Sequence, residues 1–223
     1  MAYARRVTTA AKDRRDEIVL AAVELLERHG PADMTVRKIT AKVGVSRIAV
    51  YTVFDSMAGL VAAVVDYGFA ALAAEYRTLD EQPTGLGDVW VGAQTTRDFA
   101  LAHRHLFAVM FAAESFGGYQ RTGADLDQGR EALRHMHRAC KKARASGELP
   151  LAQSDWDATR QLWVTIHGYL MLELAGYFAL DAEAGDTFAG VISTALIGLG
   201  ADSGRARGAV VTGTLVNKPA TKV

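Results

Sequence analysis

Residues 47–54 contain three side chains whose groups could bind DNA. Arg47 carries a guanidinium, Tyr51 a phenol and Thr52 a hydroxyl. An arginine can donate two hydrogen bonds to the acceptors on a guanine edge, and tyrosine and threonine hydroxyls can bond phosphate oxygens or bases. In a helix these three residues and Ile48 share one side, because residues three and four apart lie together. The spacing therefore predicts a face that binds nucleic acid.

The opposite side of this helix is apolar and needs a core to pack against. Val50 and Phe54 are four residues apart on that side. Ile39 and Val43, on a preceding short helix, have the same spacing and can supply the partner surface. The two helices are therefore expected to pack together and to hold the polar face outward.

A tight turn joins these two helices within residues 33–64. Thr35 and Ser46 stand where each helix would begin, and hydroxyl side chains there accept hydrogen bonds from unpaired N–H groups. Gly44 lies between the helices and accepts the positive φ that such a turn needs. This pattern is typical of a helix-turn-helix, whose second helix enters the major groove of DNA. The turn alone leaves open a short buried helix with a few solvated polar groups.

The flanking segments supply further helices. Residues 14–28 carry an apolar stripe at helical spacing, and His29, Gly30 and Pro31 end it. Another helix begins after Ser56. We expect a three-helix DNA-binding domain over 14–60, preceded by a flexible basic arm over 1–13 that contains Arg5 and Arg6.

This part of the chain resembles the DNA-binding domain of the TetR/AcrR family of bacterial transcription regulators. The resemblance covers residues 14–65 and is carried by the segments AAVELLERHG, MTVRKITAKVGVS and VYTVF followed by SMAGL. The resemblance and the helix faces together predict these DNA-binding residues: Thr35, Val36, Arg37, Ser46, Arg47, Ile48, Tyr51 and Thr52.

Two positions depart from the family pattern. Met57 stands where members usually carry a lysine at the start of the fourth helix, and Val53 stands where an aromatic residue or histidine is common. A lysine there would add charge to a helix N-terminus that already attracts phosphate. We therefore expect fewer backbone contacts and a shallow dependence of operator binding on salt.

Composition indicates an all-α protein. The 223 residues are 50% hydrophobic and 22% charged, with four prolines and few alternating apolar runs. The net charge is zero, but residues 1–60 hold ten Lys and Arg against seven Asp and Glu, while residues 61–200 hold eleven against seventeen. The basic surplus coincides with the helix-turn-helix, which fits a DNA-binding surface.

Neither a leader sequence nor a membrane span is predicted, so the protein is expected to be cytoplasmic. Residues 1–16 have no apolar core after their arginines. Residues 162–180 are apolar, but His167 and Glu173 would be costly inside a bilayer. The single cysteine, Cys140, excludes an internal disulfide. It reads as a small core residue, with a redox-sensing thiol as the alternative.

Residues 61–200 are predicted to form a helical ligand-binding and dimerisation domain, and residues 201–223 a disordered tail. The last two long helices, 155–180 and 186–199, carry more apolar surface than a monomer needs. TetR-family proteins dimerise through their last two long helices, so the resemblance implies a homodimer. A two-fold dimer requires a near-palindromic double-stranded operator.

The resemblance also implies a small-molecule effector. The segment 163–176 resembles a family subset named for its Trp, His and Gly, here Trp163, His167 and Gly168. These side chains and an aromatic segment could line an apolar pocket. The predicted ligand-binding residues are Phe107, Met110, Phe111, Trp163, His167 and Met171. Plain core packing is the alternative for both segments. No metal site or cofactor is predicted, since the two His-x-His pairs point apart on a helix.

The leading hypothesis is a transcriptional repressor that a small apolar ligand releases from its operator. One rival is a helical enzyme that uses His167 and Glu173, although residues six apart point in different directions on a helix. A second rival is an interaction module that keeps the fold without specific DNA binding. Activation in place of repression stays open, as do the effector and the operator sequence.

Overall fold

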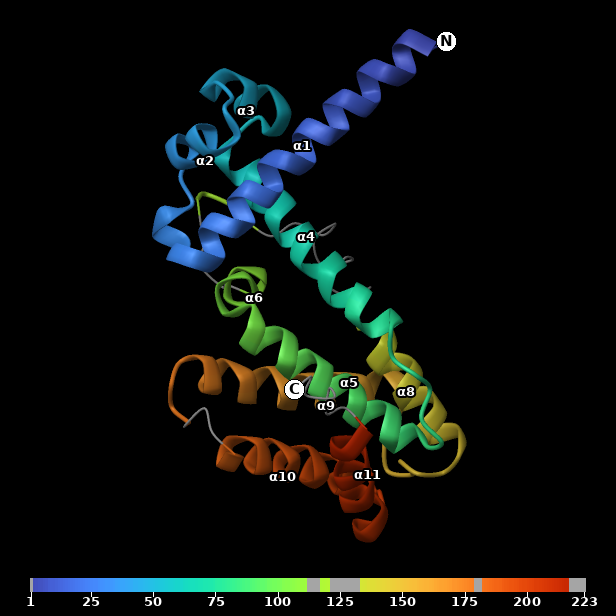
Figure 1. The fold of residues 1–223 in the computed structure, drawn as a ribbon. Coiled ribbons are helices and arrows are strands. Elements are labelled where there is room, and N and C mark those ends of the chain that lie inside the picture. The colour runs from blue at the N-terminus through green and yellow to red at the C-terminus, as the bar shows by residue number, and fades with distance from the viewer. Residues whose placement is uncertain (1, 112–116, 121–132, 179–181, 217–223) are drawn as a thin grey trace, which may run out of the picture. The chain divides into compact units, whose positions relative to one another are not determined.

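The computed structural model describes residues 2–111, 117–120, 133–178 and 182–216, and every regular element among them is helical (Figure 1). The all-α prediction is confirmed. The elements are α1 (Ala2–His29), η1 (Pro31–Asp33), α2 (Val36–Val43), α3 (Arg47–Phe54), α4 (Met57–Arg77), α5 (Gly85–Ala102), α6 (Arg104–Phe111), α8 (Arg134–Ala145), α9 (Asp155–Leu174), α10 (Ala182–Gly198) and α11 (Ser203–Val216).

The chain divides into two compact units that interleave along the sequence. Unit 1 comprises Met1–Ala71 and His103–Gly129, and unit 2 comprises Leu72–Ala102 and Arg130–Val223. The predicted domain boundary at residue 60 differs from this division. Helix α4 contributes to both units, and α6 belongs to unit 1, because its buried side chains pack within that unit.

Unit 1 is built on the apolar side of α1. Ile18, Ala22 and Leu26 from α1 are fully buried, as the predicted stripe requires, and Ile39 and Val50 from α2 and α3 are buried with them. Burying these side chains fixes the helix-turn-helix on α1 through the hydrophobic effect. The predicted core side of the second short helix is therefore confirmed at Val50 and, from the preceding helix, at Ile39.

Helix α6 joins unit 1 through one glutamate and one glycine. The Glu27 side chain accepts a hydrogen bond from Leu106 N at 2.8 Å, and the Glu27 carbonyl lies 3.1 Å from His105 Nδ1. A Cβ on Gly68 of α4 would lie 2.6 Å from Met110 Sδ. Because Gly68 has no side chain, α4 and α6 can approach closely.

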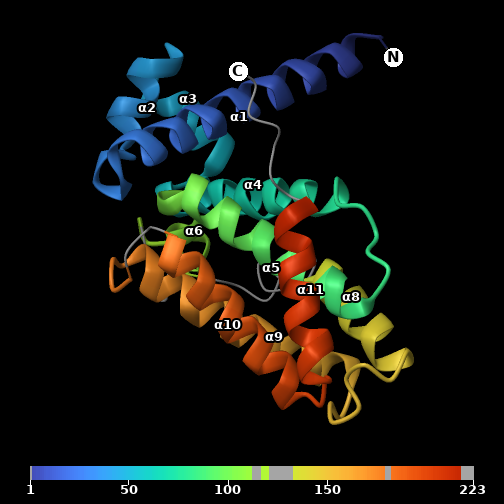
Figure 2. The same cartoon turned by 60° about the horizontal axis from the view of Figure 1, so that its bottom comes forward.

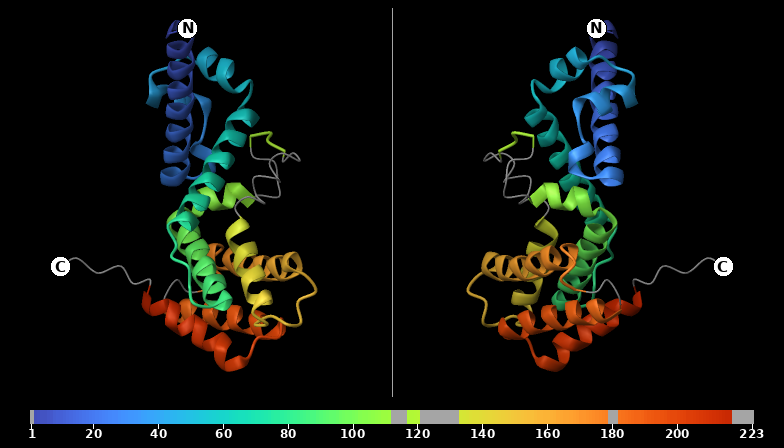
Figure 3. Two further views of the ribbon diagram at one scale, coloured as in Figure 1. Left: turned by 90° about the vertical axis from the view of Figure 1, so that its right-hand side faces the viewer. Right: turned by 90° about the vertical axis from the view of Figure 1, so that its left-hand side faces the viewer.

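Unit 2 is organised around α5, most of whose residues are buried, as expected of a core helix. Helices α8, α9, α10 and α11 all contact α5. Figure 2 shows α11 crossing α5 and α10, and α9 and α10 run alongside each other in both views of Figure 3. Trp90 of α5 and Phe188 of α10 meet in the core, with ring centroids 5.9 Å apart.

Helix α9 ends earlier than the sequence predicted. It stops at Leu174, and Gly176 adopts a φ of 82°. Tyr177 N then donates to Leu172 O at 3.0 Å and Gly176 N to Glu173 O at 3.0 Å, which is the Schellman pattern of a helix C-terminus. The prediction of one helix through residue 180, with Gly176 inside it, is therefore wrong.

The two chain ends are more helical than predicted. Helix α1 begins at Ala2, so residues 2–13 of the segment predicted as a flexible basic arm over 1–13 are part of the helix. Residues 203–216 form α11, where a disordered tail was predicted. The physical reason is tertiary packing: Ala206 and Val210 of α11 are buried against unit 2. Residues 217–223 lie outside the described residues.

Among the described residues, α4 is the one helix long and apolar enough to cross a membrane by length and composition. Many core helices of globular proteins have this composition. Leu60, Val64 and Leu72 of α4 are fully buried. The apolar residues of α4 are therefore explained by packing in the cores of the two units.

Candidate DNA-binding and ligand-binding sites

The helix-turn-helix has the caps that its sequence predicted. The Thr35 hydroxyl accepts a hydrogen bond from Lys38 N at 3.4 Å, and the Ser46 hydroxyl accepts one from Ala49 N at 3.1 Å. Gly44 follows α2 with a φ of 73°. These local interactions set the direction in which α3 leaves the turn.

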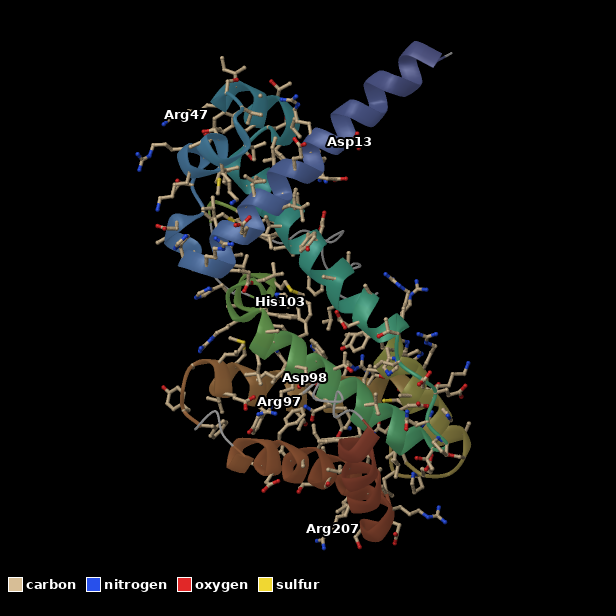
Figure 4. All side chains as sticks on the ribbon, viewed as in Figure 1. Asp13, Arg47, Arg97, Asp98, His103 and Arg207 are labelled. Carbon is tan, nitrogen blue, oxygen red and sulfur yellow. The ribbon has the colours of Figure 1, made fainter. Side chains whose placement is uncertain are left out.

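The predicted reading face of α3 is exposed. Arg47, Ile48, Tyr51 and Thr52 all face solvent, and Ile48 is 78% exposed. Figure 4 shows the Arg47 side chain extending outward from α3. The Thr52 hydroxyl donates to Ile48 O at 2.8 Å, so it can only accept a hydrogen bond from a partner. A large exposed aliphatic side chain beside Arg47 is the type of group that contacts a thymine methyl.

Helix α2 adds a second edge to this face. Arg37 is exposed, whereas Val36 is half-buried. Among the described residues, neither Arg37 nor Arg47 forms an ion pair, while Lys38 pairs with Asp33 at 2.6 Å and Lys42 with Glu24 at 2.9 Å. No described carboxylate therefore neutralises the positive charge of Arg37 or Arg47, and both guanidinium groups can pair with an external partner.

The paired carboxylates show the electrostatic effect of these lysines. The hydrogen bond from Lys38 lowers the pKa of Asp33, and the hydrogen bond from Lys42 lowers the pKa of Glu24. These pairs connect α2 to η1 and to α1. Lys38 and Lys42 therefore position α2 and are poorly placed to contact DNA phosphates at the same time.

Met57 has an internal packing role that explains its departure from the lysine pattern. A Cβ on Gly117 would lie 3.1 Å from Met57 Cγ and 3.2 Å from Val61 Cγ2. The Met57 side chain therefore packs against the segment 117–120 within unit 1. A lysine at this position would have to leave that apolar contact to reach a phosphate.

The predicted ligand-binding residues divide between the two units. Phe107 and Met110 are buried in unit 1, and Phe111 is half-buried beside them. The Phe111 ring lies 4.8 Å from that of Phe107 and 5.4 Å from that of Phe69, centroid to centroid. These contacts are those of core aromatic residues.

The other half of the predicted ligand set lies on α9 in unit 2. Trp163 and His167 are half-buried with parallel rings, 5.9 Å apart, and Met171 is partly exposed. Burial lowers the pKa of His167, so the imidazole is neutral at pH 7. A neutral imidazole beside an indole can offer one hydrogen-bonding atom in apolar surroundings.

The groups that suggested other chemistry are occupied or inert. Glu173 is completely buried, and both its carboxylate oxygens accept hydrogen bonds from Arg97 at 3.0 and 3.2 Å from Nε. It therefore cannot act with His167 as a catalytic pair. Burial raises the pKa of Cys140 to about 11, so the thiol stays protonated and unreactive at neutral pH.

Two segments of the sequence match known families. Residues 18–64 match the bacterial regulatory proteins of the tetR family, and residues 92–195 match the tetracyclin repressor-like C-terminal domain. The chain belongs to the tetR family. It is a transcriptional regulator with a DNA-binding helix-turn-helix and not an enzyme. No significantly similar sequence was found among curated proteins. The Trp-His-Gly subset within the TetR family stays a prediction.

Solved structures share this TetR fold at low sequence identity. A protein of unknown function from Rhodococcus sp. RHA1 is 22% identical, with a TM-score of 0.67, over 82% of this chain and 94% of that chain. RolR in complex with resorcinol is 14% identical, with a TM-score of 0.66, over 97% and 99%. SmeT in complex with triclosan is 24% identical, with a TM-score of 0.57, over 81% and 90%.

Sequence reasoning missed the polar residues that organise the C-terminal part of this TetR-family chain. Arg97 and Glu173 are separated by 76 residues, and Lys142 and Asp88 by 54. No local spacing connects such pairs. The only signal was an acidic or basic residue inside an apolar helix, as at Glu173, which indicates a buried partner elsewhere.

Proposed function

We propose that this TetR-family chain is a cytoplasmic repressor that binds a near-palindromic operator as a homodimer and is released by a small apolar ligand. The observation that carries the proposal is the face of α3 on which four side chains are solvent-exposed: Arg47, Ile48, Tyr51 and Thr52. Thr35, Val36, Arg37 and Ser46 complete the proposed DNA-binding set.

The proposed chemistry of recognition follows from the groups on that face. Arg47 and Arg37 supply charge that no described residue neutralises, which suits phosphate or guanine. Ile48 supplies an apolar contact. Since Lys38 and Lys42 are committed to ion pairs and Met57 is packed against Gly117, phosphate contacts are few and the salt dependence of binding should be shallow.

A homodimer is supported by the outer faces of α9 and α10. Val164 is 69% and Leu172 46% exposed on α9, and Ile197 is 36% exposed on α10. A Cβ added at Gly168 or at Gly190 would meet no atom within 4 Å. Exposed aliphatic side chains beside exposed glycines permit a second pair of helices to approach closely. A dimer through α9 and α10 would bury this surface.

The effector is proposed to be a small apolar molecule. The α9 residues Trp163, His167 and Met171 combine an apolar surface with one neutral imidazole. Phe107, Met110 and Phe111 are proposed as further ligand contacts, with a purely structural role in the core as the alternative. RolR and SmeT were solved with resorcinol and triclosan, so a fold of this type accommodates small aromatic molecules. By analogy we expect an aromatic effector here.

Operator binding is tested by fluorescence anisotropy with DNA from the upstream region of the gene. Arg47→Ala and Tyr51→Phe should weaken binding, Arg47→Ala by about tenfold or more because a good bidentate contact contributes about 1–3 kcal/mol. Arg160→Ala, an exposed arginine on α9, is the matched control and should bind like the parent. Parental affinity in both α3 variants would show that α3 is not the recognition helix.

Dimerisation is tested by size-exclusion chromatography with light scattering. Val164→Asp and Leu172→Asp should give monomers, because a carboxylate in an apolar interface is strongly unfavourable. Leu151→Asp is the control, since Leu151 is 70% exposed and lies outside α9 and α10. Dimers in all three variants would place the interface elsewhere.

A further inference from the structure

Unit 2 contains a cavity of about 650 Å³ at the end of α4, which we name the α4–α8 cavity. This volume lies within the range of small-molecule sites. Side chains from the end of α4, the segment after it and one side of α8 line it. The lining residues that matter are Tyr76, Arg77, His135, Arg138, Lys141 and Lys142. None of the α9 residues predicted to bind ligand lines this cavity, so it is a separate site.

One part of the α4–α8 cavity lining is a stacked pair of rings, in which each ring covers a face of the other. The Tyr76 and His135 rings are stacked, with centroids 5.1 Å apart and an interplanar angle of 9°. The Tyr76 hydroxyl is 2.6 Å from Thr96 Oγ1, which itself donates to Gly92 O at 2.7 Å. These bonds hold the Tyr76 ring in place.

His135 is fixed on the same wall by close packing. A Cβ on Gly92 would lie 2.8 Å from His135 Cδ2 and 3.1 Å from Nε2. Burial lowers the pKa of His135 and raises that of Tyr76 to about 12. Both rings are therefore uncharged at neutral pH. Since their faces are largely covered, the rigid, uncharged rings favour edge-to-face contact with another aromatic ring.

Two acidic residues of the cavity, Asp88 and Glu81, share one lysine. Lys142 Nζ lies 2.9 Å from Asp88 Oδ2, 3.0 Å from Glu81 Oε1 and 2.6 Å from Gln82 O. The hydrogen bond to Asp88 is the main cause that raises the pKa of Lys142. Since Lys142 is committed in this way, it contributes little free positive charge to the cavity.

Three other cationic residues line the cavity and form no ion pair with a described carboxylate. Within the described part of the chain, Arg77, Arg138 and Lys141 form no ion pair, and all three are exposed. Nearby basic residues of unit 2 do have partners: Arg144 pairs with Asp155, and Arg97 with Glu173. Asp80 is the one carboxylate of the lining without an ion pair among the described residues. The lining as a whole carries four cations against three carboxylates, so its formal net charge is +1.

We propose that the α4–α8 cavity binds an aromatic carboxylate, with its ring in edge-to-face contact with Tyr76 and His135 and its carboxylate at Arg138 and Lys141. A residue three positions along a helix lies on the same side, so one carboxylate can reach both cations from α8. Charge-assisted hydrogen bonds to the carboxylate orient the ligand, and ring contact supplies apolar burial. This proposal does not rest on the proposed repressor function.

The experiment is isothermal titration calorimetry of the full chain with 2-naphthoate, with 2-naphthamide as the uncharged analogue. Naphthoate should bind at least tenfold more tightly than the amide, and raising sodium chloride to about 0.5 M should weaken it by screening. The variant Arg138→Gln/Lys141→Gln should lose about tenfold or more in affinity, as expected for losing hydrogen bonds to a charged group. The Arg160→Gln variant, which removes an exposed arginine outside the cavity, should bind like the parent.

The location is checked by NMR of the His135 imidazole in the same samples, whose signals should shift with naphthoate in the parent protein. Equal binding of acid and amide, unchanged affinity in the double variant, or no shift at His135 would each overturn the proposal. Inorganic phosphate is titrated separately. If it binds as tightly as naphthoate and displaces it, the cavity is a simple anion site and the aromatic part of the proposal is wrong. Because operator binding is not measured, failure here leaves the repressor proposal untouched.

Discussion

The two units place their charged residues differently. In unit 1 the ion pairs of the helix-turn-helix, Lys38 with Asp33 and Lys42 with Glu24, lie at the surface. In unit 2 the pair of Arg97 and Glu173 is interior: Glu173 is fully buried and the Arg97 side chain is 12% exposed. Figure 4 marks Arg97 on α5, and Glu173 is on α9, so this pair joins two core helices.

The difference indicates how each unit maintains its shape. Exposed ion pairs contribute little to stability because water and salt screen them, so the helix-turn-helix depends on its caps, its turn glycine and a small apolar core. Breaking a buried pair is costly because it leaves an uncompensated charge. All three tryptophans, Trp90, Trp156 and Trp163, lie in unit 2, so tryptophan fluorescence reports that unit alone.

The largest effect is expected at Glu173. Glu173→Ala leaves the Arg97 guanidinium in the core without its partner and should lower the free energy of unfolding by about 3–5 kcal/mol. Urea denaturation followed by tryptophan fluorescence measures this. Replacing both residues, as Arg97→Met with Glu173→Leu, should recover most of the loss. A loss below about 1 kcal/mol for Glu173→Ala would show that the buried pair does not distinguish unit 2 from unit 1.

The next effect is expected at Gly44, in the turn of unit 1. Gly44→Ala places a Cβ on a residue with a φ of 73°, at a cost of about 1–2 kcal/mol. No atom lies within 4 Å of that Cβ, so the cost is conformational and not steric. Hydrogen exchange in α2 and α3 should accelerate while the tryptophan transition stays unchanged. Gly208→Ala in α11 is the control and should be neutral or slightly stabilising.

A smaller effect is expected from equivalent caps in the two units. Ser46 accepts from Ala49 N at 3.1 Å in unit 1, and Ser154 accepts from Asp157 N at 3.0 Å in unit 2. Ser46→Ala and Ser154→Ala should each cost about 1 kcal/mol. The tryptophan transition should move only for Ser154→Ala. If it also moves for Ser46→Ala, the two units unfold together and the comparison fails.

The smallest effect concerns pH and the surface pair of unit 1. The pKa of Asp33 is lowered by Lys38, so its contribution to stability is present above the ordinary pKa of aspartate and is lost as pH falls through the lower folded value. Carboxyl titration by NMR should show the lowered pKa in the parent and a value close to that of a free aspartate in Lys38→Gln. Equal pKa values of Asp33 in the parent and in Lys38→Gln would show that Lys38 does not lower the pKa of Asp33.

The sequence predicted the features that depend on neighbouring residues. Thr35, Gly44 and Ser46 act through bonds three to five residues away, so their types and spacing predicted the turn and its caps. The buried pair of Arg97 and Glu173 depends on packing between distant helices, which no local pattern encodes. Helix α11 was missed for a related reason: its glycines and threonines have weak helical propensity, and contacts of Ala206 and Val210 override it.

Helix α11 has a practical consequence for anyone who shortens this chain. A cut after residue 200, where the sequence patterns end, would remove the side chains that cover α5 and part of α10. The newly uncovered surface would be apolar and contiguous, which favours aggregation. A preparation truncated there would be expected to precipitate, and its failure to bind DNA or effector would say nothing about either site.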